Sequence, residues 1–232
     1  ARFNFSHGSH EEQKKRLDML REISGKSHRY IGALLDTKGP EIRIGCFENG
    51  KIDLVQGQIF CLTPEECSGN ENKVSITYQE LYRDVKVGSR ILIDDGLIEM
   101  EVQEVKGHDI YCLVKNGGTI SNRKGINVPD SDLRMPFVSQ KDYEDIVFGV
   151  EQGFDFIACS FTRSAEDILE IRKILREKGG ERIQLIAKIE NSQGVKNIDE
   201  IIAVTDGIMI ARGDMGVELP MEDVPVIQKE II

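Results

Sequence analysis

Two pairs of opposite charges follow apolar runs that look like buried strands. Lys188 and Glu190 end one run, and Arg212 and Asp214 follow another. Short apolar runs without turn signals are typical of parallel strands that are covered on both faces. Because residues two apart in a strand share a face, Lys188 and Glu190 should lie side by side. We expect the two strand ends to form one shared site that can neutralise an anionic substrate.

The composition is that of a globular protein with an acidic balance. The chain has 232 residues, of which 40% are hydrophobic and 30% charged, and its formal net charge is -10. This charge argues against nucleic acid or an anionic membrane as the main partner. We find no apolar run near the roughly 18 residues of a membrane span, and no signal peptide. The five cysteines have no paired metal-binding spacing, so we expect reduced thiols in a cytoplasmic protein.

The chain begins with a strand–helix–strand pattern. Residues 1–8 alternate apolar and polar side chains, and residues 30–35 form a second apolar run. Between them, Ser9 and Glu12 form a capping-box pattern before a helix that should end at Gly25. Such a unit implies a parallel sheet.

Residues 40–135 have a different pattern, without convincing helices. Short alternating runs are separated by turn signals such as Asp95-Gly96 and Asn116-Gly117-Gly118. We expect strands at residues 52–55, 58–62, 73–77, 90–93, 97–105 and 110–114. This spacing predicts an inserted all-β domain, either an antiparallel barrel or a sandwich.

The alternation of helices and strands resumes at residue 136. Ser139 and Ser164 should begin helices that end at Gly153 and Gly179. Further expected elements are strands at 154–160, 185–191 and 207–211 and a helix near 195–204. Residues 1–39 and 136–232 thus supply five strands that fit part of a (β/α)8 TIM-type barrel, whose active site lies at the carboxyl ends of its strands. A doubly wound sheet fits the same pattern.

Four motifs at these strand ends closely resemble the pyruvate kinase family. They are RFNFSHG at 2–8, DTKGPEIR at 36–43, KIEN at 188–191 and ARGDMGVE at 211–218. The resemblance covers the whole chain in order, including residues 40–135, which correspond to the family's β-barrel lid. It implies phosphoryl transfer from phosphoenolpyruvate to ADP, giving pyruvate and ATP, and a homotetramer in the full-length protein.

The resemblance also implies roles for individual residues. Lys188 matches the lysine that stabilises the transferred phosphoryl group and the enolate, and Arg2 matches the arginine that binds the substrate phosphate. Gly213 and Asp214 match substrate-binding positions. Glu190 and Asp214 match ligands of Mg²⁺ or Mn²⁺, for which carboxylate oxygens are well suited.

Two further sets of residues match a K⁺ site and a nucleotide site. The K⁺ ligands would be Asn4, Ser6, Asp36 and Thr37. The nucleotide phosphates would be bound by His7, Arg43 and Lys124. Because Arg43 and Lys124 lie on the inserted domain or at its border, we expect this domain to close over the nucleotide and exclude water.

Two other functions are compatible with the residues. A metal-dependent barrel enzyme of the phosphoenolpyruvate/pyruvate aldolase type also places Glu and Asp at successive strand ends, but it needs no inserted β domain. A catalytically silent fragment that binds Mg²⁺ or a nucleotide is the second. Since members of the family have further barrel strands beyond this stretch, we expect the isolated chain to be inactive.

Overall fold

The computed structural model describes residues 1–129 and 131–232, which divide into two compact units. The first unit comprises Ala1–Pro40, Pro136–Arg212 and Ile227–Ile232, and the second comprises Glu41–Met135 and Gly213–Val226. The chain therefore leaves the first unit after Pro40 and returns to it at Pro136. Residues 213–226 group with the second unit, and the division into domains made from the sequence stays a prediction.

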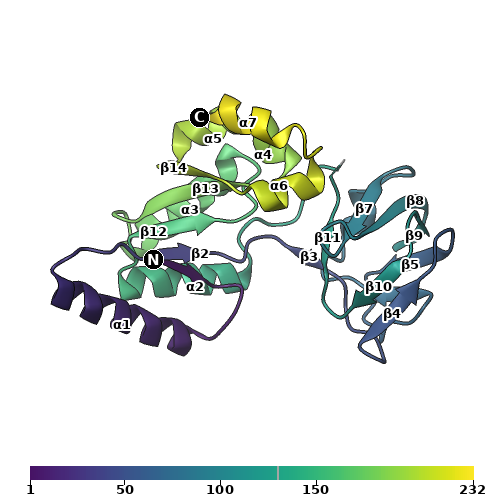
Figure 1. The fold of residues 1–232 in the computed structure, drawn as a ribbon, viewed down its shortest axis with the longest axis horizontal. Coiled ribbons are helices and arrows are strands. Elements are labelled where there is room, and N and C mark those ends of the chain that lie inside the picture. Colours follow the sequence, from purple (N-terminus) through teal and green to yellow (C-terminus); the bar gives the residue numbers. More distant parts are fainter. Residues whose placement is uncertain (130) are drawn as a thin grey trace. The chain divides into compact units, whose positions relative to one another are not determined.

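The first unit is built on a five-stranded parallel sheet (Figure 1). In spatial order its strands are β1 (Arg2–Asn4), β2 (Leu34–Asp36), β12 (Phe156–Cys159), β13 (Gln184–Ile189) and β14 (Gly207–Ile210). This order follows the chain without a reversal, as in a (β/α)8 barrel. A doubly wound sheet would instead reverse its strand order at a switch point.

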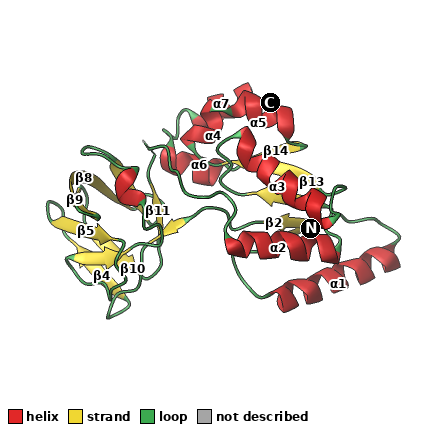
Figure 2. Ribbon diagram, turned by 180° about the vertical axis from the view of Figure 1, so that it is seen from behind, coloured by secondary structure: helices red, strands yellow, loops and turns green. Residues whose placement is uncertain are grey.

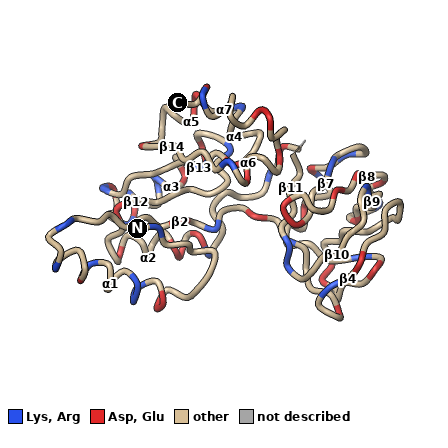
Figure 3. The backbone as a smooth tube through the Cα atoms, in the orientation of Figure 1, with Lys and Arg blue, Asp and Glu red and all other residues tan. Residues whose placement is uncertain are grey.

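Helices alternate with these strands. They are α1 (His10–Ser27), α2 (Gln140–Gln152), α3 (Ala165–Lys178), α4 (Ser192–Lys196), α5 (Ile198–Val204), α6 (Arg212–Glu218) and α7 (Val224–Ile231), of which the last two span limits between the units. In the first unit α1 packs on α2, α2 on α3, and α3 on α5. Figure 3 shows basic and acidic residues along α1, where pairs such as Lys14 and Asp18 join successive turns on the exposed surface. Within the described residues, the helices are too short or too polar to cross a membrane.

Local capping interactions set several helix ends. The Ser9 hydroxyl accepts a hydrogen bond from the Glu12 N–H, and the Glu12 carboxylate accepts one from the Ser9 N–H, which confirms the capping box. The predicted helix ends at Gly153 and Gly179 are also confirmed, since both glycines take the left-handed conformation directly after α2 and α3.

Several elements differ from their predicted bounds, among them the first helix and the second strand. Helix α1 does not end at Gly25 but continues to Ser27, because His28 takes the left-handed conformation and its N–H bonds to the Gly25 carbonyl. The apolar run at 30–35 forms a strand only from Leu34 onward. Tyr30, at the start of this run, is exposed, and its hydroxyl bonds to Asp155.

The second unit consists mainly of strands between Glu41 and Met135 (Figure 2). Its larger sheet has the order β3 (Ile42–Arg43), β11 (Gly125–Asn127), β7 (Arg90–Ile93), β8 (Ile98–Lys106), β9 (Asp109–Val114), β5 (Ile59–Thr63) and β6 (Lys73–Ser75). A smaller sheet pairs β4 (Lys51–Leu54) with β10 (Gly118–Ser121), and η1 (Leu81–Arg83) is a 3-10 helix.

The two edges of the larger sheet are hydrogen-bonded to each other. The Gly45 N–H donates to the Ser75 carbonyl at 2.7 Å, and the Thr77 N–H donates to the Arg43 carbonyl at 2.9 Å. The sheet therefore curls back on itself around a core of buried aliphatic and aromatic side chains. The sequence pattern did not predict β3, β10 and β11, because such short strands depend on their pairing partners more than on their own residues.

Candidate active site

Polar side chains gather at the carboxyl ends of four neighbouring strands of the first unit. Asn4 at the end of β1 and Ala158 of β12 both pair in register with Asp36 at the end of β2. Lys188 lies near the end of β13, which pairs with β12. Because the strands are parallel, residues far apart in the chain reach the same edge of the sheet.

The Lys188 ammonium lies at the centre of this group. Its Nζ is 3.0 Å from Asp36 Oδ1, 3.0 Å from Glu190 Oε1 and 2.8 Å from Ser160 Oγ. Burial of this side chain, which is 7% exposed, lowers the pKa of Lys188. The charges of Glu190 and Asp36 outweigh burial, so the pKa is raised overall and the ammonium is charged at neutral pH. The predicted proximity of Lys188 and Glu190 is thus confirmed.

The Asp36 carboxylate is shared by two cations. Both Nε and Nη2 of Arg2 lie 2.5 Å from Asp36 Oδ2, while Lys188 contacts Oδ1. Asp36 is 1% exposed, whereas the Arg2 side chain is 59% exposed. The guanidinium therefore keeps part of its donor surface accessible to an incoming anion.

The Glu190 carboxylate follows directly after β13 and is 2% exposed. Its Oε1 contacts Lys188, and its Oε2 accepts a hydrogen bond of 2.6 Å from the backbone N–H of Phe161. Phe161 has a φ of +57°, a left-handed conformation that is uncommon for a residue with a bulky side chain. The β12 strand end therefore supports this carboxylate through its backbone.

The four residues expected at the K⁺ site lie on adjoining segments. Asn4 Oδ1 accepts from the Ser6 N–H at 2.9 Å, and Asn4 shares its register with Asp36. Thr37 is buried, and its carbonyl and hydroxyl both bond to Ser160. The structure thus brings Asn4 close to Asp36 and Thr37 close to Ser160, while binding of one cation by all four stays a prediction.

The residues predicted to bind the nucleotide are divided between the two units. In the second unit, Gly125 pairs with Arg43 across β11 and β3, so that Lys124 and Arg43 lie on neighbouring segments. Both cations have acidic partners: Arg43 pairs with Glu41 at 2.7 Å and Lys124 pairs with Asp94 at 2.9 Å. His7 is an exposed residue of the first unit.

Gly213 and Asp214 belong to the second unit and lie in the first turn of α6. The sequence pattern did not predict this helix, and β14 ends earlier, at Ile210. Asp214 is exposed. Its place in one site with Glu190 is a prediction.

Comparison with known proteins identifies the family. A family model described as "Pyruvate kinase, barrel domain" matches residues 1–232. The chain belongs to the pyruvate kinase family. It is 51% identical over 234 residues to a pyruvate kinase of Bacillus licheniformis and 50% identical over 233 residues to one of Clostridium perfringens. All of this chain is covered in both matches, which span 40% and 49% of those two relatives.

Membership of the pyruvate kinase family confirms the predicted barrel class for the first unit. It agrees with the strand order of the sheet and argues against the doubly wound alternative. It also accounts for polar residues at the carboxyl ends of the strands, where barrel enzymes carry their active sites.

Sequence reasoning missed three residues that support the site. Ser160 and Phe161 directly follow β12, and this place at a strand end was the one signal for them in the sequence, since neither is charged as Lys188 is. Gln13 gave no such signal. Its Nε2 donates to the Asn4 carbonyl at 2.9 Å and to the His7 carbonyl at 3.0 Å, which holds the segment after β1 from one side.

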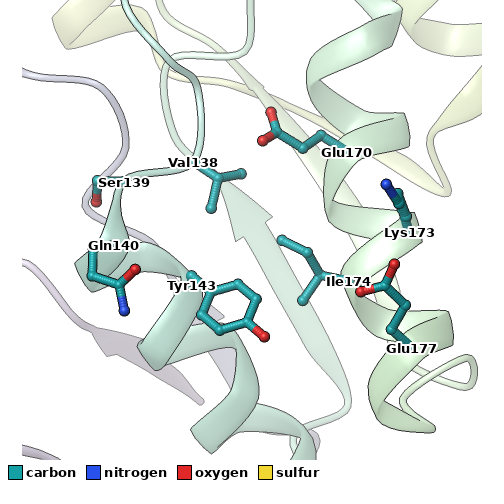
Figure 4. A pocket seen from close by; sticks show the side chains of 8 residues that line it. All are labelled: Val138, Ser139, Gln140, Tyr143, Glu170, Lys173, Ile174 and Glu177. Carbon is teal, nitrogen blue, oxygen red and sulfur yellow. The ribbon is translucent and has the colours of Figure 1, made fainter.

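A cavity of about 290 Å³ lies between α2 and α3, away from these strand ends. Figure 4 shows its lining, with Tyr143 and Ile174 pointing into it from the two helices. Burial and the charge of Asp167 raise the pKa of Glu170 at its rim. The lining contains none of the predicted site residues, so this cavity is separate from the candidate active site.

Proposed function

We propose that the full-length protein containing this chain is a pyruvate kinase. It would transfer the phosphoryl group of phosphoenolpyruvate to ADP, giving pyruvate and ATP in the last step of glycolysis. The observation that carries the proposal is the buried group formed by Lys188, Asp36 and Glu190, with Arg2 at its edge, in a chain of this family. The chain spans less than half the length of the relatives above, so this activity belongs to the longer protein.

Lys188 is the proposed catalytic cation. The charged ammonium is already fixed in position by three acceptors among the described residues. It would stabilise negative charge on the transferred phosphoryl group and on the enolate. Arg2 would bind the substrate phosphate through the exposed part of its guanidinium. Gly213 and Asp214 would complete the substrate site.

Glu190 and Asp214 are the proposed ligands of Mg²⁺ or Mn²⁺. The described residues contain no preformed group of three or more His, Cys, Asp or Glu side chains able to hold a metal ion. The donor chemistry nevertheless fits Mg²⁺, which commonly takes one or two carboxylates and completes its shell with water and substrate oxygens. When bound, the ion would neutralise charge on the phosphate oxygens.

The proposed K⁺ ligands are Asn4, Ser6, Asp36 and Thr37. Their amide, hydroxyl, carboxylate and carbonyl oxygens are suitable donors for a large monovalent cation. The hydrogen bond between Asn4 and the Ser6 N–H gives the segment after β1 a defined turn.

His7, Arg43 and Lys124 are the proposed contacts of the nucleotide phosphates. Because Arg43 and Lys124 already pair with Glu41 and Asp94, an incoming phosphate would compete with these carboxylates. We further propose a cytoplasmic homotetramer that binds neither nucleic acid nor membrane, in keeping with the net charge of -10.

The test is ATP formation by the purified full-length protein. We expect ATP to form from phosphoenolpyruvate and ADP only when both Mg²⁺ and K⁺ are present. A folded full-length protein that forms no ATP under these conditions would contradict the proposal. Condensation of pyruvate with an aldehyde in its place would favour the aldolase-type alternative.

A further inference from the structure

We infer that Ser160 is a positioning residue for Lys188. This inference rests on the proposed function, and it concerns a side chain at the end of β12 that lies outside the set of residues assigned from the family motifs. Ser160 is 2% exposed, and its hydroxyl contacts three groups from two other strand ends. Among the described residues, three side chains accept hydrogen bonds from the ammonium, and Ser160 is the uncharged one.

Three described acceptors surround the Lys188 ammonium. An ammonium has three N–H donors. Ser160 Oγ, Asp36 Oδ1 and Glu190 Oε1 supply three acceptors at 2.8 to 3.0 Å. Three acceptors fix a tetrahedral ammonium in position, whereas two leave it free to turn about the line between them.

The hydroxyl proton of Ser160 has two acceptors within reach. The Thr37 carbonyl lies 2.7 Å from Oγ and Asp36 Oδ1 lies 3.2 Å away, so the single proton points preferentially to the carbonyl. Donation to a fixed carbonyl turns the lone pairs of Oγ toward Lys188. The Ser160 N–H donates in turn to Thr37 Oγ1 at 3.1 Å, which anchors the backbone of the same residue.

The backbone next to Ser160 supports Glu190. Ser160 directly precedes Phe161, whose left-handed conformation lets its N–H reach Glu190 Oε2. Two consecutive residues of the β12 end thus contact the proposed catalytic lysine and the proposed metal ligand. A displacement of Ser160 would therefore change the position of the Lys188 ammonium relative to the Glu190 carboxylate.

The experiment compares two variants in the full-length enzyme. Ser160→Ala removes the acceptor, and we expect kcat to fall about 10- to 100-fold, the loss typical of a misplaced catalytic group. Binding of phosphoenolpyruvate, measured by calorimetry in the presence of Mg²⁺ and K⁺, should change much less. Thr162→Val is the matched control, because it removes a fully buried hydroxyl that donates to the Cys159 carbonyl. Its kcat should stay near that of the wild type even if its melting temperature falls.

The outcomes separate this inference from the proposed function. An inactive wild type would overturn the proposed function itself. An active wild type with an unchanged kcat in folded Ser160→Ala would overturn the role of Ser160, as would an equal loss of kcat in Thr162→Val. If Ser160→Ala does not fold, Ser160→Cys provides the same test, since sulfur has a similar position but is a weak acceptor. Retained kcat in Ser160→Cys would then count against the inference.

Discussion

Lys188, Asp36 and Glu190 are ionisable side chains that are each less than a tenth exposed. Burial of a charge costs several kcal/mol, so such groups persist only where partners compensate for the lost water. Each of the three has an oppositely charged neighbour within 3.0 Å. A satisfied polar network of this kind adds little net stability but holds its members rigidly, as the proposed phosphoryl transfer would require.

Gly39 permits the close approach of two strand ends at this site. Its φ is +71°, and a Cβ at this position would lie 2.7 Å from the Ser160 carbonyl. We expect Gly39→Ala in the full-length protein to lower the free energy of unfolding by more than the ~1 to 2 kcal/mol typical of a left-handed alanine. Because the clash also displaces Ser160, kcat should fall as well.

Gly50→Ala is the control for this prediction. Gly50 has a similar φ of +79°, but no atom lies within 4 Å of the added Cβ. Urea denaturation of the two variants separates the cost of the backbone conformation from that of the clash. If the free energy of unfolding falls equally in both variants, the contact of the added Cβ with Ser160 makes no contribution to stability.

The charge pattern singled out Lys188 and Glu190, because charges at the end of an apolar run are unusual, whereas Arg2 and Asp36 were assigned from the resemblance to the family motifs. Sequence reasoning missed Ser160, since a serine after a strand is common and its role depends on three partners brought in by folding. The same limit applies to Gln13, which lies on a helix and acts on the backbone of Asn4 and His7. Roles that rest on tertiary contacts leave little trace in the local pattern.

Among helices and strands, the predictions that depend on residues close together in the chain were the most accurate. The helices after Ser9, Ser139 and Ser164 begin where capping patterns indicate, because a cap is a contact over three residues. Strand β7 was also predicted with its observed bounds. Strands β3 and β11 were missed, since each owes its conformation to pairing with a distant segment.

Asp84 links the 3-10 helix η1 to the rest of the second unit. Its carboxylate accepts from the Tyr78 hydroxyl at 2.7 Å, from the Arg134 N–H at 3.0 Å and from Arg134 Nε at 2.7 Å. Burial raises the pKa of Asp84, but these hydrogen bonds outweigh burial and hold the pKa below its ordinary value. The charged form of Asp84 is therefore bound more favourably in the folded state than in the unfolded state.

This preference gives a pH-dependent prediction. Asp84→Asn in the full-length protein should lower the free energy of unfolding at neutral pH by about 1–3 kcal/mol, the usual worth of hydrogen bonds to a charged group. Because the pKa of Asp84 is lower in the folded state, its charged form stabilises the protein at pH values above the unfolded-state pKa of about 4. This contribution disappears as the pH falls through the folded-state pKa. The difference between wild type and variant in urea denaturation should thus shrink on acidification.

Glu80→Gln is the comparison for Asp84→Asn, because it removes only an exposed ion pair with Arg83 and should have little effect. A difference between wild type and Asp84→Asn that stays constant from neutral to acidic pH would refute the assigned role of Asp84.

The described sheet of the first unit has β1 and β14 as its edges. A closed barrel has no edge strands, and open edges favour association with other chains. We therefore expect the 232-residue chain, produced alone, to form little or no ATP from phosphoenolpyruvate and ADP. Robust Mg²⁺- and K⁺-dependent ATP formation by this chain alone would contradict that expectation.

The most direct measurement compares ATP formation by full-length Lys188→Met and by the wild type, with binding of phosphoenolpyruvate measured in parallel. Loss of a charge that stabilises the transition state should lower kcat by about 10²- to 10³-fold. The affinity for phosphoenolpyruvate should be largely kept. Lys14→Met, which removes an exposed lysine of α1, should leave both quantities unchanged. Near-normal turnover by folded Lys188→Met would contradict the account, because it would remove Lys188 from the chemistry.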